Sequence, residues 1–211
     1  MVERLASPRR LADGSAGDVD YGSIGAVYRD CRVADPRIAS FVHAALGDAR
    51  SVLNIGAGTG SYEPTDRLVT PVEPSATMRA RRPASLPTAI DAYWLDEYAP
   101  EVIDTEASRY PAISALAAGL GGVTTVSAVP IPLDCQDGFN DAYYGRPEML
   151  LEPAARLACS AWSFVAPAAI ARFEAHLAKD LADGTWDRKH GHLRSQPFLE
   201  GALVLVVSKP S

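Results

Sequence analysis

The stretch "SVLNIGAGTG", residues 51–60, decides the fold of this chain. Its short apolar run, without polar alternation, is typical of a strand that is buried on both faces. The run stops at glycines spaced two apart, and glycine lacks the Cβ that would keep the backbone away from a ligand. The stretch therefore predicts a strand that ends in a ligand-binding turn.

An acidic residue after the next apolar run completes the pattern. "RLVTPVE", residues 67–73, is typical of a second buried strand and ends on Glu73. A carboxylate at this place can accept hydrogen bonds from both ribose hydroxyls of a nucleoside. The third glycine comes one residue early for a pyrophosphate-binding turn, which favours a nucleoside ligand without a diphosphate.

Helix signals precede these two strands. Residues 35–47 begin with Asp35, a good N-cap, and end on Gly47, a good helix stop. The apolar residues on one helical face are Ile38, Phe41, Val42, Ala45 and Leu46. Strands that alternate with helices predict an α/β sheet.

The rest of the chain continues the alternation. We expect a short helix over 75–83 and a short strand over 88–90. Helical pieces broken at Pro100 and Pro111 follow over 93–122, and a strand over 123–129. Two helices over 147–162 and 166–184 and a fully buried last strand over 202–208 complete the chain. A stripe in the helix over 166–184 favours a core-facing side over a partner surface. Its members are Ile170, Phe173, Leu177 and Leu181.

The composition of the 211 residues narrows the function classes. A formal charge of −6 without a cluster of Lys and Arg argues against a nucleic-acid partner. No apolar run approaches the roughly 20 residues of a membrane helix. Three scattered cysteines indicate reduced thiols and a cytoplasmic protein. We expect a mobile N-terminal segment over 1–20, without a signal peptide, and a single domain over 21–211.

Two motifs resemble a known family. "VLNIGAGTGSYEP" (52–64) and "VEPSATM" (72–78) resemble motifs I and II of class I S-adenosylmethionine-dependent methyltransferases. "DYGSIGAVYRDCRVADPRIA" (20–39) resembles the opening of a bacterial small-molecule branch of that family. The resemblance implies a Rossmann-like fold, S-adenosylmethionine as cofactor and S-adenosylhomocysteine as product. It also implies a helical cap over about 134–197, inserted before the last strand, that covers a small-molecule substrate.

The resemblance extends to individual residues of the cofactor site. Tyr28 and Arg32 correspond to an aromatic residue and an arginine that close over the methionine end of the cofactor. Asn54 stands where many members have aspartate, so one carboxylate near the cofactor amine is absent. The implied cofactor-binding residues are Tyr28, Arg32, Asn54, Gly56, Ala57, Gly58, Gly60, Glu73, Pro74, Ser75 and Met78. No catalytic residue is assigned.

After residue 91 the chain departs from the family pattern. Members continue with a fourth strand, a helix and a fifth strand, but no apolar strand-like run lies between Asp91 and Gly122. The sequence thus predicts a missing internal block and a shortened sheet of five strands. The strand over 51–55 would have an open edge. Either the last strand moves beside it, or a second copy of the chain covers it, and the homodimer is favoured.

Other residues could carry chemistry. His190 or His192 could act as a general base, although a solvated loop before the last strand is the favoured interpretation. No third possible ligand lies near His190 and His192 at the spacing of a metal site, so no metal site is predicted.

An aromatic segment lies in the predicted cap. Cys135, Phe139, Tyr143 and Tyr144 could form a wall over the substrate, or the two tyrosines could pack at the surface. We expect the acceptor site between Tyr28 and the segment from Phe139 to Trp162.

Two functions remain open. The first is an S-adenosylmethionine-dependent methyltransferase that acts on a small molecule and is impaired by the missing block. Such an enzyme mainly positions donor and acceptor. The alternative is a degenerate methyltransferase-fold protein that no longer methylates, either a natural-product enzyme of other chemistry or a non-catalytic binding or interaction protein.

Overall fold

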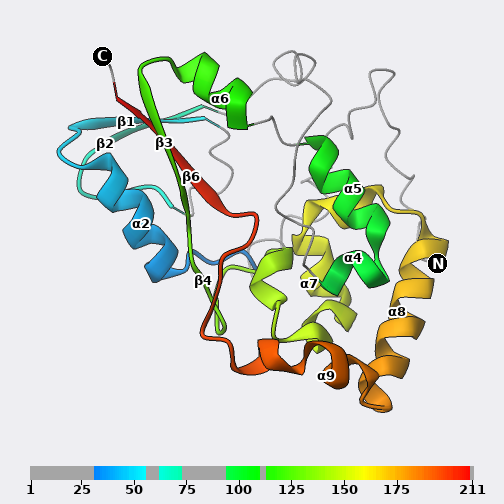
Figure 1. Ribbon diagram of the computed structural model, residues 1–211. Coiled ribbons are helices and arrows are strands. Elements are labelled where there is room, and N and C mark those ends of the chain that lie inside the picture. Colours follow the sequence, from blue (N-terminus) through cyan, green and yellow to red (C-terminus); the bar gives the residue numbers. More distant parts are fainter. Residues whose placement is uncertain (1–30, 56–61, 73–93, 110–112, 210–211) are drawn as a thin grey trace.

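The computed structural model describes residues 31–55, 62–72, 94–109 and 113–209 (Figure 1). Its strands are β1 (Ser51–Ile55), β2 (Leu68–Val72), β3 (Val123–Ala128), β4 (Ile131–Pro132), β5 (Phe198–Leu199) and β6 (Val204–Lys209). Its α-helices are α2 (Pro36–Leu46), α4 (Trp94–Tyr98), α5 (Pro100–Arg109), α6 (Ile113–Leu120), α7 (Pro153–Ala158), α8 (Pro167–Ala182) and α9 (Thr185–His190). Short 3-10 helices are η1 (Asn140–Tyr143), η2 (Pro147–Leu151), η3 (Ser160–Phe164) and η4 (Gly191–Ser195).

The two strands that flank the glycine stretch are present and parallel. β1 pairs with β2, and the register places Ile55 opposite Val72, the last residue of each strand. The glycine stretch belongs to the connection between them, as a parallel pair requires a crossover. A mixed α/β fold is therefore confirmed at the stretch that predicted it.

The two strands predicted over 123–129 and 202–208 are present and form an antiparallel pair. β3 pairs with β6 from Val123 opposite Lys209 to Ala128 opposite Val204. β4 and β5 form a third pair, so the described strands make three two-stranded ladders in place of one five-stranded sheet. Among the described strands, the last strand does not lie beside β1; it pairs with β3. The expected strand over 88–90 lies outside the described residues.

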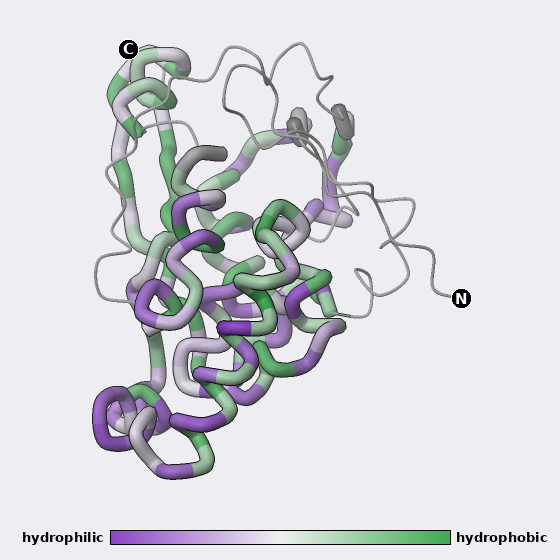
Figure 2. Tube along the Cα trace, turned by 90° about the vertical axis from the view of Figure 1, so that its right-hand side faces the viewer, coloured by the Kyte–Doolittle hydropathy of each residue, from purple (hydrophilic) through white to green (hydrophobic). Residues whose placement is uncertain are grey.

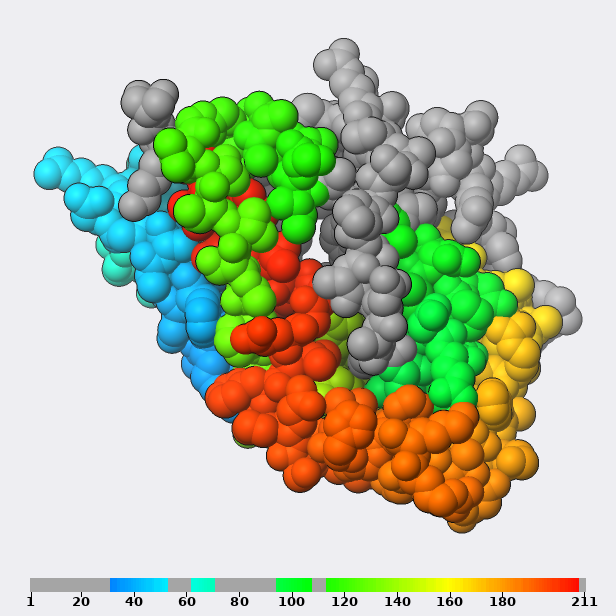
Figure 3. Space-filling model, in the orientation of Figure 1, coloured from blue at the N-terminus to red at the C-terminus, as the bar shows by residue number. Residues whose placement is uncertain are grey.

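The last strand is less buried than we expected. Residues 204–208 of β6 are only partly buried, and in β3 Val123 is 66% and Val126 46% exposed. Figure 3 shows β3 at the surface beside α6, and the tube near the C-terminus in Figure 2 is largely hydrophobic. A two-stranded ladder buries little by itself. The prediction of a fully buried strand was wrong for this reason.

The main core lies among the helices of the other half of the molecule (Figure 1). Trp94 is at its centre, with ring centroids 5.8 Å from those of Tyr98 and Trp186 in edge-on arrangements. Such aromatic pairs stabilise a core beyond the area they bury. This cluster ties α4 to α9.

The apolar stripe of α8 faces this core, as predicted. Phe173 and Leu177 are completely buried, and Ile170 and Leu181 are partly buried against the same cluster. This face of α8 therefore packs into the core and does not form a surface for a partner.

α2 begins and ends where its caps predict. The Asp35 side chain accepts a hydrogen bond from the Arg37 N–H, and Gly47 has a φ of 51°, a conformation that favours glycine. Of the predicted apolar face, only Ile38 is buried, and Phe41 is exposed. The face is poorly covered because α2 lies along the narrow β1–β2 pair, away from the helical core (Figure 1).

The helical region over 93–122 is broken at Pro100, as predicted, while Pro111 lies outside the described residues. α4 and α5 bury apolar side chains, whereas α6 has no buried residue. No described helix is long and apolar enough to cross a membrane.

Two predicted segments need correction. The helix over 147–162 is divided into η2, α7 and η3, because Pro153 lacks an N–H and starts a new helix. The expected loop around His190 and His192 is helical, as α9 and η4, because Trp186 anchors it in the core.

Candidate functional site

Two of the predicted site residues lie within the described part of the chain. Asn54 is in β1, opposite Pro71 of β2, and Arg32 forms an isolated β-bridge with Asp137. The other predicted residues lie outside the described residues: Tyr28, Gly56, Ala57, Gly58, Gly60, Glu73, Pro74, Ser75 and Met78. The structure describes the strands that lead directly into the glycine stretch and into Glu73.

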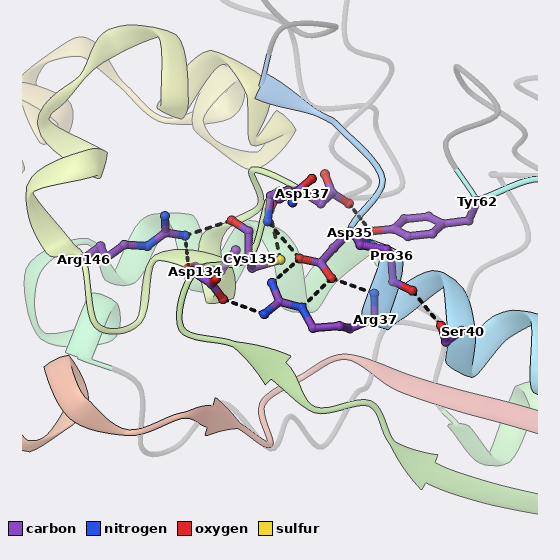
Figure 4. A network of polar contacts seen from close by, with 11 residues as sticks. Asp35, Pro36, Arg37, Ser40, Tyr62, Asp134, Cys135, Asp137 and Arg146 are labelled. Carbon is purple, nitrogen blue, oxygen red and sulfur yellow. Dashed lines mark hydrogen bonds and ion pairs between the residues drawn. The ribbon is translucent and has the colours of Figure 1, made fainter.

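Arg32 and Tyr62, both partly buried, contact the buried side chain of Asp137, and the three residues are here called the Asp137 cluster. Nε of Arg32 donates to Oδ1 of Asp137 at 2.5 Å, and Nη2 donates to Oδ2 at 3.2 Å. The Tyr62 hydroxyl donates to Oδ2 of Asp137 at 2.8 Å, and Figure 4 shows the two side chains turned toward each other. Asp137 is 2% exposed whereas the Arg32 side chain is 26% exposed, so the carboxylate of this bidentate pair is held away from water and the guanidinium is partly accessible.

The Asp137 cluster joins segments that are far apart in sequence. Arg32 precedes α2, Tyr62 follows the last glycine of the glycine stretch by two positions, and Asp137 belongs to the predicted cap. Burial, together with the negative charge of Asp137, raises the pKa of Tyr62 above its ordinary value. Tyr62 is therefore a hydrogen-bond donor at neutral pH and is not suited to remove a proton.

The backbone beside the cluster is closely packed. The Gly138 N–H donates to the Cys31 carbonyl at 2.8 Å. A Cβ at Gly138 would lie 2.6 Å from that carbonyl oxygen and 2.6 Å from the Tyr143 hydroxyl. Only glycine permits this approach. The cap segment and the segment before α2 are therefore held together by backbone as well as by side chains.

A second network holds the start of α2 against the cap (Figure 4). The buried Asp35 carboxylate accepts from the Arg37 guanidinium, and from the Gln136 N–H at 3.0 Å. Arg37 also donates to Asp134 at 2.6 Å. Hydrogen bonds from Arg37, and then from the Gln136 backbone, hold the pKa of Asp35 well below its usual range. This network is structural, since its donors and acceptors satisfy one another.

A third polar group lies between α5 and the cap. Asn140 is buried, and its Nδ2 donates to Oε1 of Glu106 at 2.8 Å while its Oδ1 accepts from Nε1 of Trp162 at 3.0 Å. Burial raises the pKa of the Cys159 thiol, and the charges of Glu106 and Asp137 raise it further. The Cys159 thiol donates to the Gly138 carbonyl at 3.6 Å, one residue after Asp137, so this group adjoins the Asp137 cluster.

The remaining candidates have structural partners. His190 packs on Trp186 with ring centroids 5.5 Å apart, and its Nε2 lies 3.3 Å from Oε2 of Glu97. His192 is exposed. The contact between His190 and Glu97 links α9 to α4. Within the described ranges, no group of His, Cys, Asp and Glu has the arrangement of a metal site.

The aromatic cap segment is packed inward. Tyr143 and Tyr144 are buried in the core rather than at the surface, and the Tyr144 hydroxyl donates to the Gln196 carbonyl at 2.6 Å. Cys135 is also buried, and burial raises its pKa to about 12. Phe139 is only partly buried against the core. Of these residues, Phe139 therefore has the most freedom to contact a ligand.

Among solved structures, the chain is similar to a presumed methyltransferase from an antibiotic biosynthesis pathway of Anabaena variabilis ATCC 29413. The TM-score is 0.70 at 21% sequence identity, and the match covers 85% of this chain and 100% of that chain. The two proteins therefore share a fold. No family model and no curated protein matches the sequence. Because all of the neighbour's chain is covered, this comparison gives no support to the missing internal block.

Sequence reasoning missed Tyr62, Asp137, Glu106 and Asn140. A signal for Tyr62 was its place directly after the glycine stretch. Asp137 and Asn140 were visible as polar residues within an aromatic segment, but nothing local connects either of them with a partner in another segment.

Proposed function

We propose that the chain binds S-adenosylmethionine and transfers its methyl group to a small-molecule acceptor. The observation that carries this proposal is the parallel register of β1 and β2, in a chain that shares the fold of a presumed methyltransferase. Because Ile55 and Val72 are register partners, the glycine stretch and Glu73 begin at the same edge of the strand pair. Ligands of open α/β sheets bind beyond the carboxyl ends of the strands.

The residues at this edge suit the cofactor. The glycines allow the backbone to approach the ligand closely, and the Glu73 carboxylate suits the ribose hydroxyls. When bound, S-adenosylmethionine supplies an activated methyl group on a sulfonium. The protein then has to orient donor and acceptor and to exclude water, which is mainly a task of positioning.

We place the acceptor between Tyr28 and the segment from Phe139 to Trp162. Support comes from the partly buried Phe139 and from the nearby Asn140, a buried polar residue among aromatic side chains. Sites for small molecules are mostly apolar, with few polar groups that fix orientation. This composition favours a small, largely apolar acceptor.

Calorimetric titration with S-adenosylhomocysteine tests the cofactor site. We expect binding by the wild-type protein and a loss of about 1–3 kcal/mol for Glu73→Ala, the range for hydrogen bonds to charged groups. Glu200→Ala, at an exposed position before β6, serves as the control and should bind like the wild type. If neither S-adenosylmethionine nor S-adenosylhomocysteine gives heat or a thermal shift with the wild-type protein, the proposal is wrong.

Binding without transfer would favour the alternative of a degenerate methyltransferase fold. Impaired transfer is the expectation that follows from the predicted missing block. Robust turnover of a methyl acceptor by the 211-residue chain would contradict that expectation.

A further inference from the structure

The structure assigns a binding role to Asp141, a residue of the predicted cap. We propose that its carboxylate binds an ammonium group of the small-molecule acceptor, which makes the acceptor an amine. This rests on the proposed function, because it names the class of acceptor for that site. The groups that carry the proposal all lie within the described residues.

The short helix η1 holds Asp141 in a fixed place. The other three residues of η1, Asn140, Ala142 and Tyr143, are buried. Oδ2 of Asp141 accepts a hydrogen bond from the Ala202 N–H at 2.9 Å. The carboxylate is therefore anchored between η1 and the segment that leads into β6, and groups held in this way are ready for a ligand.

The main chain comes close to this carboxylate at Gly201. A Cβ at this position would lie 2.6 Å from Oδ2 of Asp141 and 3.3 Å from Cδ2 of Leu199. The first of these distances is too short for any side chain, so only glycine permits the approach. Gly201 therefore leaves the space that the carboxylate occupies beside the end of β5.

The other oxygen of Asp141 is left unpaired. Among the described residues, the Ala202 N–H is the one hydrogen-bond donor to this carboxylate, and no Lys, Arg or His forms an ion pair with it. Burial raises the pKa of Asp141 above its ordinary value, because the charged form loses contact with water. A carboxylate in such a place lacks a counter-charge, and a cation at Oδ1 would supply it.

Asp141 differs in this respect from three other acidic residues of the described chain. Asp35, Asp137 and Asp180 are fully buried, and each accepts a hydrogen bond from a cationic side chain. These partners are Arg37, Arg32 and Lys179, respectively. Asp141 has no such partner, and it is partly exposed. A carboxylate with a perturbed pKa that a ligand can reach is typical of a functional site.

The neighbours of Asp141 indicate what the rest of the ligand is like. Leu199 and Phe139 are partly buried apolar side chains that pack against the core. Leu199 lies beside the Gly201 position, and Phe139 precedes η1 directly. A single charged group beside apolar side chains suits an amine that is carried on a small apolar body.

The experiment compares two probes that share an aromatic body. Benzylamine is an ammonium ion at neutral pH, whereas benzyl alcohol is neutral. Ligand-observed NMR titration of the full chain at about 0.3 M salt screens the general attraction of a chain with a net charge of −6. We expect the wild-type protein to bind benzylamine at least about 10-fold more tightly than benzyl alcohol.

Asp141→Asn tests the assignment to this residue. Asparagine keeps an oxygen for the Ala202 N–H but has no charge, so the preference for benzylamine should fall to less than about 3-fold while the affinity for benzyl alcohol is unchanged. Asp134→Asn is the matched control, since Asp134 is an exposed carboxylate of the same segment that pairs with Arg37. It should keep the wild-type preference.

A second variant covers the case that Asp141→Asn does not fold, as judged by thermal unfolding. Gly201→Ala displaces the carboxylate without removing its charge, and it should weaken benzylamine more than benzyl alcohol. If neither variant folds, the order of the two probes on the wild-type protein decides.

The outcomes separate this proposal from the proposed function, because the titrations contain no methyl donor. A wild-type protein without a preference for benzylamine, or an Asp141→Asn variant that keeps the preference, would overturn the role of Asp141 alone. A protein that keeps the preference but binds neither S-adenosylmethionine nor S-adenosylhomocysteine would overturn the proposed function, and with it the assignment of the amine as a methyl acceptor.

Discussion

At the scale of single residues, the buried Asp35 accepts several hydrogen bonds that one substitution can test. It caps α2 and accepts from Arg37 and from the Gln136 N–H of the cap segment. We expect Asp35→Ala to lower the free energy of unfolding by about 2–3 kcal/mol. This combines the loss of an N-cap with the loss of charge-assisted hydrogen bonds. Urea unfolding measures the loss.

The charge of Asp35 adds a pH dependence. Because its pKa in the folded state lies below the ordinary 3.8, its ionic contribution is complete above about pH 4 and is lost as the pH falls further. The stability difference between wild type and Asp35→Asn should therefore be constant from pH 7 to 5 and shrink toward pH 3. Asp104→Asn, at an exposed position on α5, is the control. A difference that grows on acidification would contradict the assignment.

At the scale of elements, α6 and α8 both carry leucines, which the structure buries to different degrees. Leu177 of α8 is 0% exposed, whereas Leu116 of α6 is 39% exposed. We expect Leu177→Ala to cost about 2–5 kcal/mol because it leaves a cavity. Leu116→Ala should cost less than about 1 kcal/mol. Chemical unfolding of both variants makes the comparison, and equal losses would show that α6 is packed as tightly as α8.

At the scale of the whole molecule, the apolar surface is unevenly distributed. Several large hydrophobic side chains among the described residues are exposed in the half that holds α2, β2, α6 and β3. They are Val33, Phe41, Leu68, Ile113, Leu116, Leu120, Val123 and Val126. Within the described residues, the outer edges of β1, β3 and β6 have no strand partner. Open strand edges and contiguous apolar surface favour association. We propose that this half pairs with a second copy of the chain.

Light scattering over a range of concentrations tests the dimer. We expect a dimer for the wild-type protein and a shift toward monomer for Val126→Lys, which places a charge on exposed β3. Met149→Lys, exposed on η2 in the other half, should not alter the mass. A wild-type protein that is monomeric at every concentration would contradict the proposal.

The sequence by itself determined the features that depend on neighbouring residues. The caps of α2, the stripe of α8, the break at Pro100 and the positions of β1, β2, β3 and β6 were all predictable, because turns, caps and apolar periods act within a few residues. The fold class followed from the order of these elements. The glycine stretch and Glu73 predicted a cofactor-binding edge in the same way, and that site remains a prediction.

Only the tertiary structure decided which distant groups meet. The hydrogen bonds of Asp137 with Arg32 and Tyr62 join positions that are 105 and 75 residues apart. The exposure of β6 was also decided by the tertiary structure. Its apolar sequence predicted burial, but among the described strands it pairs only with β3. Whether a side chain is buried, and which polar partner it meets, depends on distant segments of the chain. A polar side chain that packing shields from water needs a hydrogen-bond partner, and that partner can come from any segment that packs beside it.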